Sequence, residues 1–362
     1  MTSKTWHDIW EAKQVSKGFD FATAKAQDTL KELLSCNGFN SATGSFSLHA
    51  YQSFIAKIFA QARLESASSL YEVGCGAGAF LYALNAHKAT QNAISHAESI
   101  SAFNGGGGGD MSKLPLIPKD SKINTESTLQ QSANYALDST TLRGTLKHSM
   151  QANLSQQGVY SALDSKASPY HVSNDSKEPT CLDSKFITES SPKDSQSLSE
   201  SKHASMALQG FSLLGGIDYS ASLASIAKRA LPHAHITQGE AIEIDSSAYD
   251  CVCSFSAFHY FPSIEYAREV ATKMIEKARQ CVLFLDILDL GTKEADIAYK
   301  KQLCGEAEYE RLYGGATVHL YYSREMFIEL AKACGYAVRI EQQDIEGYEN
   351  SPFRFNAIMY KE

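Results

Sequence analysis

Short apolar runs alternate along the chain with longer segments in which apolar residues recur every three or four positions. The first pattern predicts buried strands, and the second predicts helices that pack on one side. The runs expected as strands cover 70–73, 211–218, the start of 235–243, the start of 249–261, 280–287, 336–340 and 353–360. The segments expected as helices cover 79–85, 221–231, 264–278 and 323–334, with further helical spacing at Trp6, Ile9 and Trp10 and over 21–34. Strands that alternate with helices favour an open, mostly parallel α/β sheet.

Three glycines, Gly74, Gly76 and Gly78, stand at alternate positions between the first expected strand and the first expected helix. Without side chains, they let the backbone turn sharply, approach a ligand closely and pack the helix against the strand. Together with Ala79 they also satisfy the relaxed dinucleotide fingerprint of NAD and FAD enzymes, and an ordinary turn can carry the same letters. The loop therefore predicts a nucleotide-like cofactor without choosing which one.

Glu72 bears on this choice because it places a carboxylate two residues before the first glycine. That charge would repel a pyrophosphate and attract a cationic amino acid group. The segment 72–78 accordingly resembles motif I of class I S-adenosylmethionine-dependent methyltransferases. The resemblance implies S-adenosyl-L-methionine as the cofactor, with Glu72 near its ammonium group and the three glycines supporting its methionine and ribose parts. A surface acid at a strand end is the alternative for Glu72.

A second acid is expected about 20 residues further on, where a carboxylate at a strand end can accept hydrogen bonds from ribose hydroxyls. No residue fits at that distance, and the match is Asp218, at the end of the run 211–218. Setting residues 89–208 aside restores the usual separation, with ten residues on each side of the gap. The sequence therefore predicts one methyltransferase core, 45–88 and 209–362, interrupted by an insertion.

The predicted insertion, 89–208, contains 23 serines among 120 residues and a run of five glycines at 105–109. Its 10 basic and 12 acidic side chains nearly cancel, which argues against a nucleic-acid arm. Because so little apolar area cannot offset the entropy of ordering, we expect a disordered, low-complexity excursion. A docking role toward an unknown protein partner stays open.

The remaining motifs continue the resemblance to class I methyltransferases. Glu240, in a Gly-Glu-Ala segment, is implied to face the adenine amino group, with the backbone of Ala241 beside the ring. Tyr219 and Ser254, next to the second-strand and fourth-strand motifs, are assigned to the cofactor as well. The resemblance implies an α/β fold with a Rossmann-like, doubly wound, seven-stranded sheet whose last strand is antiparallel. It also implies that the N-terminal helices, 1–44, form a lid over the substrate pocket, although they can equally cover one sheet edge.

Methyl transfer to a hydroxyl requires an aligned acceptor and a base that takes its proton. His259, after the fourth strand, is the first candidate for that base and His319 is the second, because histidine titrates near neutral pH. Each can equally be a packed histidine with no role in the reaction. Tyr260, Tyr322 and Arg354 are assigned to the acceptor.

Two short segments, 323–327 and 348–356, resemble small-molecule methyltransferases of surface-glycan and related biosynthesis. On that resemblance, Arg354 or Arg324 would hold a phosphate or carboxylate of the acceptor by bidentate contacts. The sequence thus predicts methyl transfer to oxygen on a small-molecule acceptor, a sugar or phosphorylated intermediate. A non-catalytic cofactor-binding or scaffold protein and an NAD-dependent oxidoreductase are the alternatives.

Composition narrows the expected partners and location. A net charge of −8 disfavours a general nucleic-acid binder, which needs a basic stripe to neutralise phosphates. Eight cysteines include no C-x-x-C pair, which favours a reducing cytoplasm. No stretch reaches the roughly 18 apolar residues of a membrane span, and no signal-peptide core follows Met1. His233 and His235 have no cysteine or carboxylate cluster nearby in sequence, so no metal site is expected.

Overall fold

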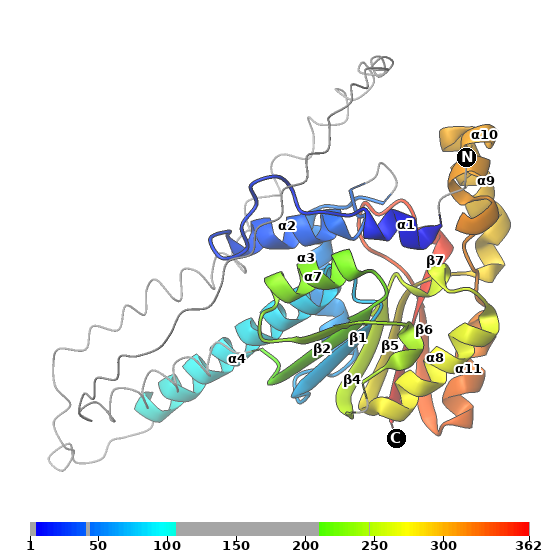
Figure 1. Cartoon of the computed structure of the whole chain (residues 1–362). Helices are drawn as coiled ribbons and strands as arrows, with labels where there is room; N and C mark the ends of the chain where they lie inside the picture. Colours follow the sequence, from blue (N-terminus) through cyan, green and yellow to red (C-terminus); the bar gives the residue numbers. More distant parts are fainter. Residues whose placement is uncertain (1–4, 41–43, 106–209, 246, 362) are drawn as a thin grey trace, which may run out of the picture. The chain divides into compact units, whose positions relative to one another are not determined.

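Seven strands form one sheet in the described part of the computed structural model, in the order β3-β2-β1-β4-β5-β7-β6 (Figure 1). The structure describes residues 5–40, 44–105, 210–245 and 247–361. The strands are β1 (Ser69–Val73), β2 (Leu213–Asp218), β3 (His235–Gln238), β4 (Tyr249–Phe255), β5 (Ala278–Leu288), β6 (Tyr336–Gln342) and β7 (Arg354–Lys361). β7 runs antiparallel to both of its neighbours, and the other pairs are parallel. The predicted Rossmann-like sheet with an antiparallel last strand is therefore confirmed.

Helices cover both faces of this sheet because successive side chains of a strand point to opposite sides. In β5, Cys281 and Leu283 belong to the core on one face, whereas Val282 and Phe284 belong to the core on the other. The helices on the first face are α2 (Ala26–Cys36), α3 (Leu48–Gln61), α4 (Ala79–Gly105) and α7 (Ala221–Ala230), and those on the second are α8 (Ile264–Lys277) and α11 (Arg324–Ala333). Helices bury both faces of the sheet, which explains the continuous apolar runs of the central strands.

Among the described residues, three further helices lie beyond the ends of the strands. They are α1 (Trp6–Glu11), α9 (Lys293–Cys304) and α10 (Glu306–Tyr313). Figure 1 shows them on the same side of the strands. α9 follows β5 through a short 3₁₀ turn, so this side is the one at which the parallel strands end.

α7 shows how the sequence fixes the place where a helix begins. The hydroxyl of Ser220 accepts a hydrogen bond from the backbone N–H of Leu223 at 3.2 Å, which satisfies one of the free N–H groups of the first turn. Lys228 and Arg229 lie in the last turn, where the helix dipole favours positive charge. Because the cap follows Asp218 by two residues, the helix start holds that acid at a defined place.

The structure differs from the sequence prediction in its helices. α4 continues to Gly105, 17 residues past residue 88, where we placed the start of the insertion. The rest of the predicted insertion, from 106 to 208, lies outside the described residues. The predicted helices 221–231, 264–278 and 323–334 are confirmed, whereas α3, α9 and α10 were not predicted. Among the helices that the structure describes, none combines the length and the apolar character needed to cross a membrane.

Candidate cofactor and acceptor site

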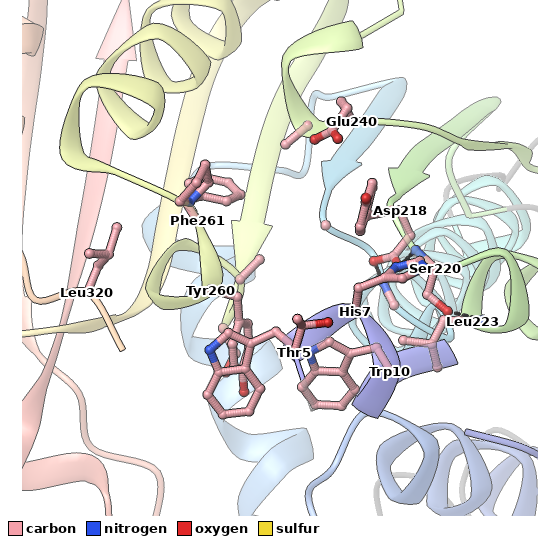
Figure 2. Close-up of a pocket in the computed structure, with 18 of the residues that line it drawn as sticks. Thr5, His7, Trp10, Asp218, Ser220, Leu223, Glu240, Tyr260, Phe261 and Leu320 are labelled. Atoms are coloured by element: carbon pink, nitrogen blue, oxygen red, sulfur yellow. Dashed lines mark hydrogen bonds between the residues drawn. The ribbon is translucent and has the colours of Figure 1, made fainter. Parts of the chain in front are cut away.

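A cavity of about 640 Å³ opens at the carboxyl ends of β1, β2 and β4, the edge at which sheets of this kind bind ligands. Figure 2 shows Asp218 and Glu240 on one side of this cavity and Tyr260 and Leu320 on the other. α1 contributes to its wall the side chains of Trp6, His7 and Trp10. The volume falls within the range of pockets that hold small molecules, roughly 300 to 1,000 Å³.

The glycine loop, which follows β1, forms part of the cavity wall. Gly74 and Gly76 line the cavity, and Gly76 has a φ of +54°. A Cβ at Gly76 would stand 2.5 Å from Oδ1 of Asn37, and the positive φ would strain any larger residue there. Gly78 has a different role, because a Cβ there would press on Ala227 of α7 at 3.3 Å. Two of the three predicted glycines thus border the cavity, and the third allows close packing of the loop on a helix.

Asp218 lies at the end of β2, with its carboxylate bound to the glycine loop. Its two oxygens accept hydrogen bonds from the backbone N–H groups of Gly76 at 2.7 Å and Ser220 at 2.9 Å. Burial nevertheless outweighs these bonds and raises the pKa of the carboxyl to about 6. The side chain borders the cavity, so a polar ligand there would meet a carboxylate that is only partly satisfied by the protein.

Glu72 lies on the neighbouring strand, with only 2% of its surface exposed. β1 pairs in parallel with β2, so Glu72 and Asp218 come from the same edge of the sheet, as the sequence predicted. Oε2 of Glu72 has no hydrogen-bond partner among the described residues. Burial, with a further contribution from the charge of Asp218, raises the pKa of Glu72 well above its usual range. Glu72 does not border the cavity directly.

The other predicted cofactor residues divide into two groups. Tyr219, Glu240 and Ala241 line the cavity, and the hydroxyl of Tyr266 donates a hydrogen bond to Glu240 at 3.0 Å. Ser254 is buried in β4, its Oγ has no partner among the described residues, and it does not line the cavity.

Tyr260 is the predicted acceptor residue that reaches the cavity. It lies in a 3₁₀ turn, Phe258–Tyr260, and its ring meets those of Trp6 and Trp10 edge-on, at centroid distances of 4.8 and 5.2 Å. Two aromatic side chains of α1 therefore hold it in place. This contact joins the N-terminal segment to the loop that follows β4.

The two candidate bases stand just behind this wall. His259 has 1% of its surface exposed, and its Nδ1 has no partner in the described part of the chain. His319 stacks on Trp6 with ring centroids 4.8 Å apart and lies 4.9 Å from the ring of His259. Burial lowers the pKa of both imidazoles well below the usual range, and the charges of Arg354 and Lys300 add to that effect. Both are therefore neutral at pH 7.

Tyr322 and Arg354, also predicted to meet the acceptor, do not line the cavity. The hydroxyl of Tyr322 donates a hydrogen bond of 2.6 Å to the carbonyl of Phe258, which holds the 3₁₀ turn in place. Arg354 is buried and pairs with Asp286 at 2.7 Å. Arg324, the other arginine considered, is partly exposed and pairs with the buried Asp289. These side chains are committed to contacts within the protein.

Asn37 is a wall residue that the sequence reasoning missed. It caps the end of α2, and its Oδ1 accepts a hydrogen bond from the backbone N–H of Ala77 at 2.6 Å. The N-terminal segment thereby fixes the glycine loop directly. Asn37 followed by Gly38 signals the end of a helix, but that signal says nothing about which distant loop the side chain reaches.

Comparison with known proteins gave matches among solved structures alone. No protein-family model matches the chain, and no curated protein sequence matches it. Similar structures include the plantazolicin methyltransferase BpumL in complex with SAH, at 10% identity over 93% of this chain and 95% of that one, with a TM-score of 0.42. The plantazolicin methyltransferase BamL in complex with a triazolic desmethylPZN analog and SAH has 10% identity over 93% and 96%, with a TM-score of 0.40. Magnesium protoporphyrin IX methyltransferase from Synechocystis PCC 6803 with bound SAH has 9% identity over 92% and 94%, with a TM-score of 0.39.

Proposed function

We propose that this chain is an S-adenosylmethionine-dependent methyltransferase that transfers a methyl group to oxygen on a small molecule. The observation that carries the proposal is the arrangement of two acids, Glu72 and Asp218, at neighbouring strand ends around a glycine loop. A dinucleotide would place a pyrophosphate above this loop, where the acid at Glu72 disfavours it. A cofactor with an ammonium group gains from the same charge.

The cavity residues then have distinct roles toward the cofactor. Asp218 would accept hydrogen bonds from the ribose hydroxyls, and Glu240 and Ala241 would border the adenine. An ammonium group beside Glu72 would lower the pKa of its carboxyl, so that the acid releases its proton and pairs with the cofactor. Gly78 supports the loop through α7 and does not meet the ligand itself.

On the acceptor side, the reaction needs alignment and a proton acceptor. S-Adenosylmethionine supplies a sulfonium methyl group, whose transfer removes a positive charge and needs no metal. The acceptor hydroxyl must lose its proton as the new bond forms. We assign that proton to His259 first and to His319 second, because both imidazoles are neutral and each keeps one ring nitrogen without a partner among the described residues. A sugar or phosphorylated intermediate is the class of acceptor that we propose.

Calorimetry with S-adenosylhomocysteine and with NAD tests the cofactor assignment. We expect the full chain to bind S-adenosylhomocysteine and to release no measurable heat with NAD. A pyrophosphate beside Glu72 would raise the pKa of this buried acid further, whereas an ammonium group can pair with its carboxylate. Incubation with tritiated S-adenosylmethionine and a small-metabolite extract then tests catalysis, with heat-treated protein as the control. Binding of NAD in place of S-adenosylhomocysteine would contradict the proposal, and cofactor binding without any labelled product would favour a non-catalytic binder.

Asn37→Ala is expected to weaken S-adenosylhomocysteine binding by about 2- to 10-fold, the effect of one neutral hydrogen bond. The substitution removes the contact that holds Ala77, without touching a residue assigned to the cofactor itself. Asn40→Ala is the matched control, since Asn40 is exposed and donates a hydrogen bond to Ser35 rather than to the glycine loop. Equal affinities for the two variants would show that α2 does not position the loop.

A further inference from the structure

A small second cavity, of about 40 Å³, lies next to the main one. Val318 borders both. The polar side chains in the wall of the small cavity are those of Lys293, Lys300, Tyr309, Tyr313, His319 and Tyr321. Each of them is a cation, an imidazole or a phenol, and no carboxylate of the described residues borders this cavity. A wall of this composition offers hydrogen-bond donors and positive charge, which suit an anion.

Lys300 is the central cation of this wall. It has 7% of its surface exposed, and its Nζ pairs with Asp296 at 2.7 Å and lies 5.1 Å from the ring centre of Tyr313. Burying an ammonium group is costly unless its donors are used. Asp296 accepts one of the three donors, and no other hydrogen bond from Nζ is formed within the described residues. The remaining donors are available to a ligand.

His319 connects the two cavities. Its ring stacks on Trp6, in the wall of the main cavity, and lies 5.3 Å from Tyr313, in the wall of the small one. Nε2 of His319 is buried and has no hydrogen-bond partner among the described residues. The charged groups that act on this imidazole are Lys300 and Arg354, both positive. In the tautomer with the ring proton on Nε2, this nitrogen is a donor without a partner, and the positive potential around it favours a negatively charged acceptor.

The size of the small cavity selects among anions. A water molecule needs roughly 10 to 15 Å³ of such space, so 40 Å³ holds about three water-sized positions. A carboxylate has three heavy atoms, whereas a phosphate group has five. The space therefore fits a carboxylate better than a phosphate.

We propose that this small cavity binds a carboxylate of the acceptor, held by Lys300 and His319, while the rest of the acceptor occupies the main cavity. The role as an acceptor site rests on the proposed methyltransferase function, but binding of a carboxylate does not depend on it. The acceptor is then an acidic hydroxyl compound. Arg354, which the sequence suggested for this purpose, keeps its pairing with Asp286.

Acetate is the probe for this cavity, and Trp6 is the reporter, since it stacks on His319. We expect acetate to change the tryptophan fluorescence of the full chain in a saturable way, whereas acetamide and chloride at equal concentration leave it unchanged. Lys300→Met should weaken acetate binding by about 10- to 100-fold, the loss expected for a charged hydrogen bond. Lys301→Met is the matched control, because Lys301 is the next residue and pairs with Glu306 on the surface.

A second variant covers the case in which Lys300→Met fails to fold, because that change leaves the buried Asp296 without its cation. The double variant Asp296→Asn/Lys300→Met removes both charges and should also lose acetate binding. Acetate binding that survives in a folded variant of either kind would overturn the proposal, and so would tighter binding of inorganic phosphate than of acetate. S-Adenosylhomocysteine binding is measured on the same samples. If it is absent while acetate still binds through Lys300, the methyltransferase proposal fails and the carboxylate site stands.

Discussion

Asp218→Asn is expected to weaken S-adenosylhomocysteine binding by about 10- to 100-fold while changing the free energy of unfolding of the empty protein little. The first effect follows because hydrogen bonds to a charged group contribute roughly 1.5 to 3 kcal/mol. The second follows because burial disfavours the charged carboxylate and raises its pKa to about 6. Asparagine loses one hydrogen bond to the backbone but also removes a poorly solvated charge, and the two effects oppose each other.

Asp250→Asn is the matched control, since Asp250 sits in β4 near its amino end, far along the strand from the cavity. Burial opposes its ionisation, but hydrogen bonds from Ser68 and the ion pair with Arg279 outweigh burial and lower its pKa to about 2. This variant should bind S-adenosylhomocysteine normally and lose about 1 to 3 kcal/mol of stability at pH 7. Calorimetry and urea unfolding of both variants check the contrast. Loss of stability without loss of affinity in Asp218→Asn would remove Asp218 from the site.

The two aspartates also predict opposite pH dependences of stability. The pKa of Asp250 is lowered in the folded state, so its contribution is present above the unfolded pKa, near 4, and is lost as the pH falls toward 2. The pKa of Asp218 is raised, so the folded state binds more protons between pH 4 and 6, and stability falls as the pH rises through that window. Above pH 6 the empty protein carries the full penalty of the Asp218 charge. A ligand that forms hydrogen bonds with this carboxylate offsets that penalty.

The part of the cavity that we propose for the cofactor could be predicted from the sequence because its two acids lie at strand ends. Glu72 and Asp218 follow apolar runs, and parallel strands bring their carboxyl ends to one edge. The separation between the two acids became recognisable once the intervening serine-rich segment was set aside. That reading of the sequence required β1 to pair with β2, and the structure shows this pairing. The depth of Glu72, which leaves it behind the cavity wall, depends on packing and could not be read from the sequence.

The part that we propose for the acceptor was harder to predict because its helices have weak apolar patterns. The buried side chains of α9 are Asp296 and Lys300, so its apolar periodicity is obscured at the positions that face inward. α10 has no buried residue at all, which leaves its sequence without an apolar stripe. The sequence pattern therefore does not predict the small cavity between these helices and His319. Arg354 shows the opposite error, since its charge suggested a ligand but its partner, Asp286, lies in a strand far away in sequence.

His259→Asn is expected to lower the rate of methyl transfer by about 100- to 10,000-fold, the usual contribution of a general base, while S-adenosylhomocysteine affinity stays within about twofold. Asparagine preserves a polar group of similar size but cannot take a proton at neutral pH. His233→Ala is the control, because His233 is an exposed histidine outside the cavity. Transfer of the tritiated methyl group from S-adenosylmethionine to the acceptor in the extract measures the rate.

The pH profile separates a base from a buried structural histidine. Burial, with the charge of Arg354, holds the pKa of His259 well below its usual range, so the acid limb of the parent's rate should lie well below pH 6.5. The same lowered pKa means that the unfolded chain binds more protons at acidic pH, so stability falls as the pH drops below 6.5. His259→Asn should remove part of this acid sensitivity whether or not His259 is the base. If His259 is the base, His259→Asn should in addition flatten the acid limb of the residual rate. A variant with the parent's rate and acid limb would show that His259 is not the base and would make His319 the candidate.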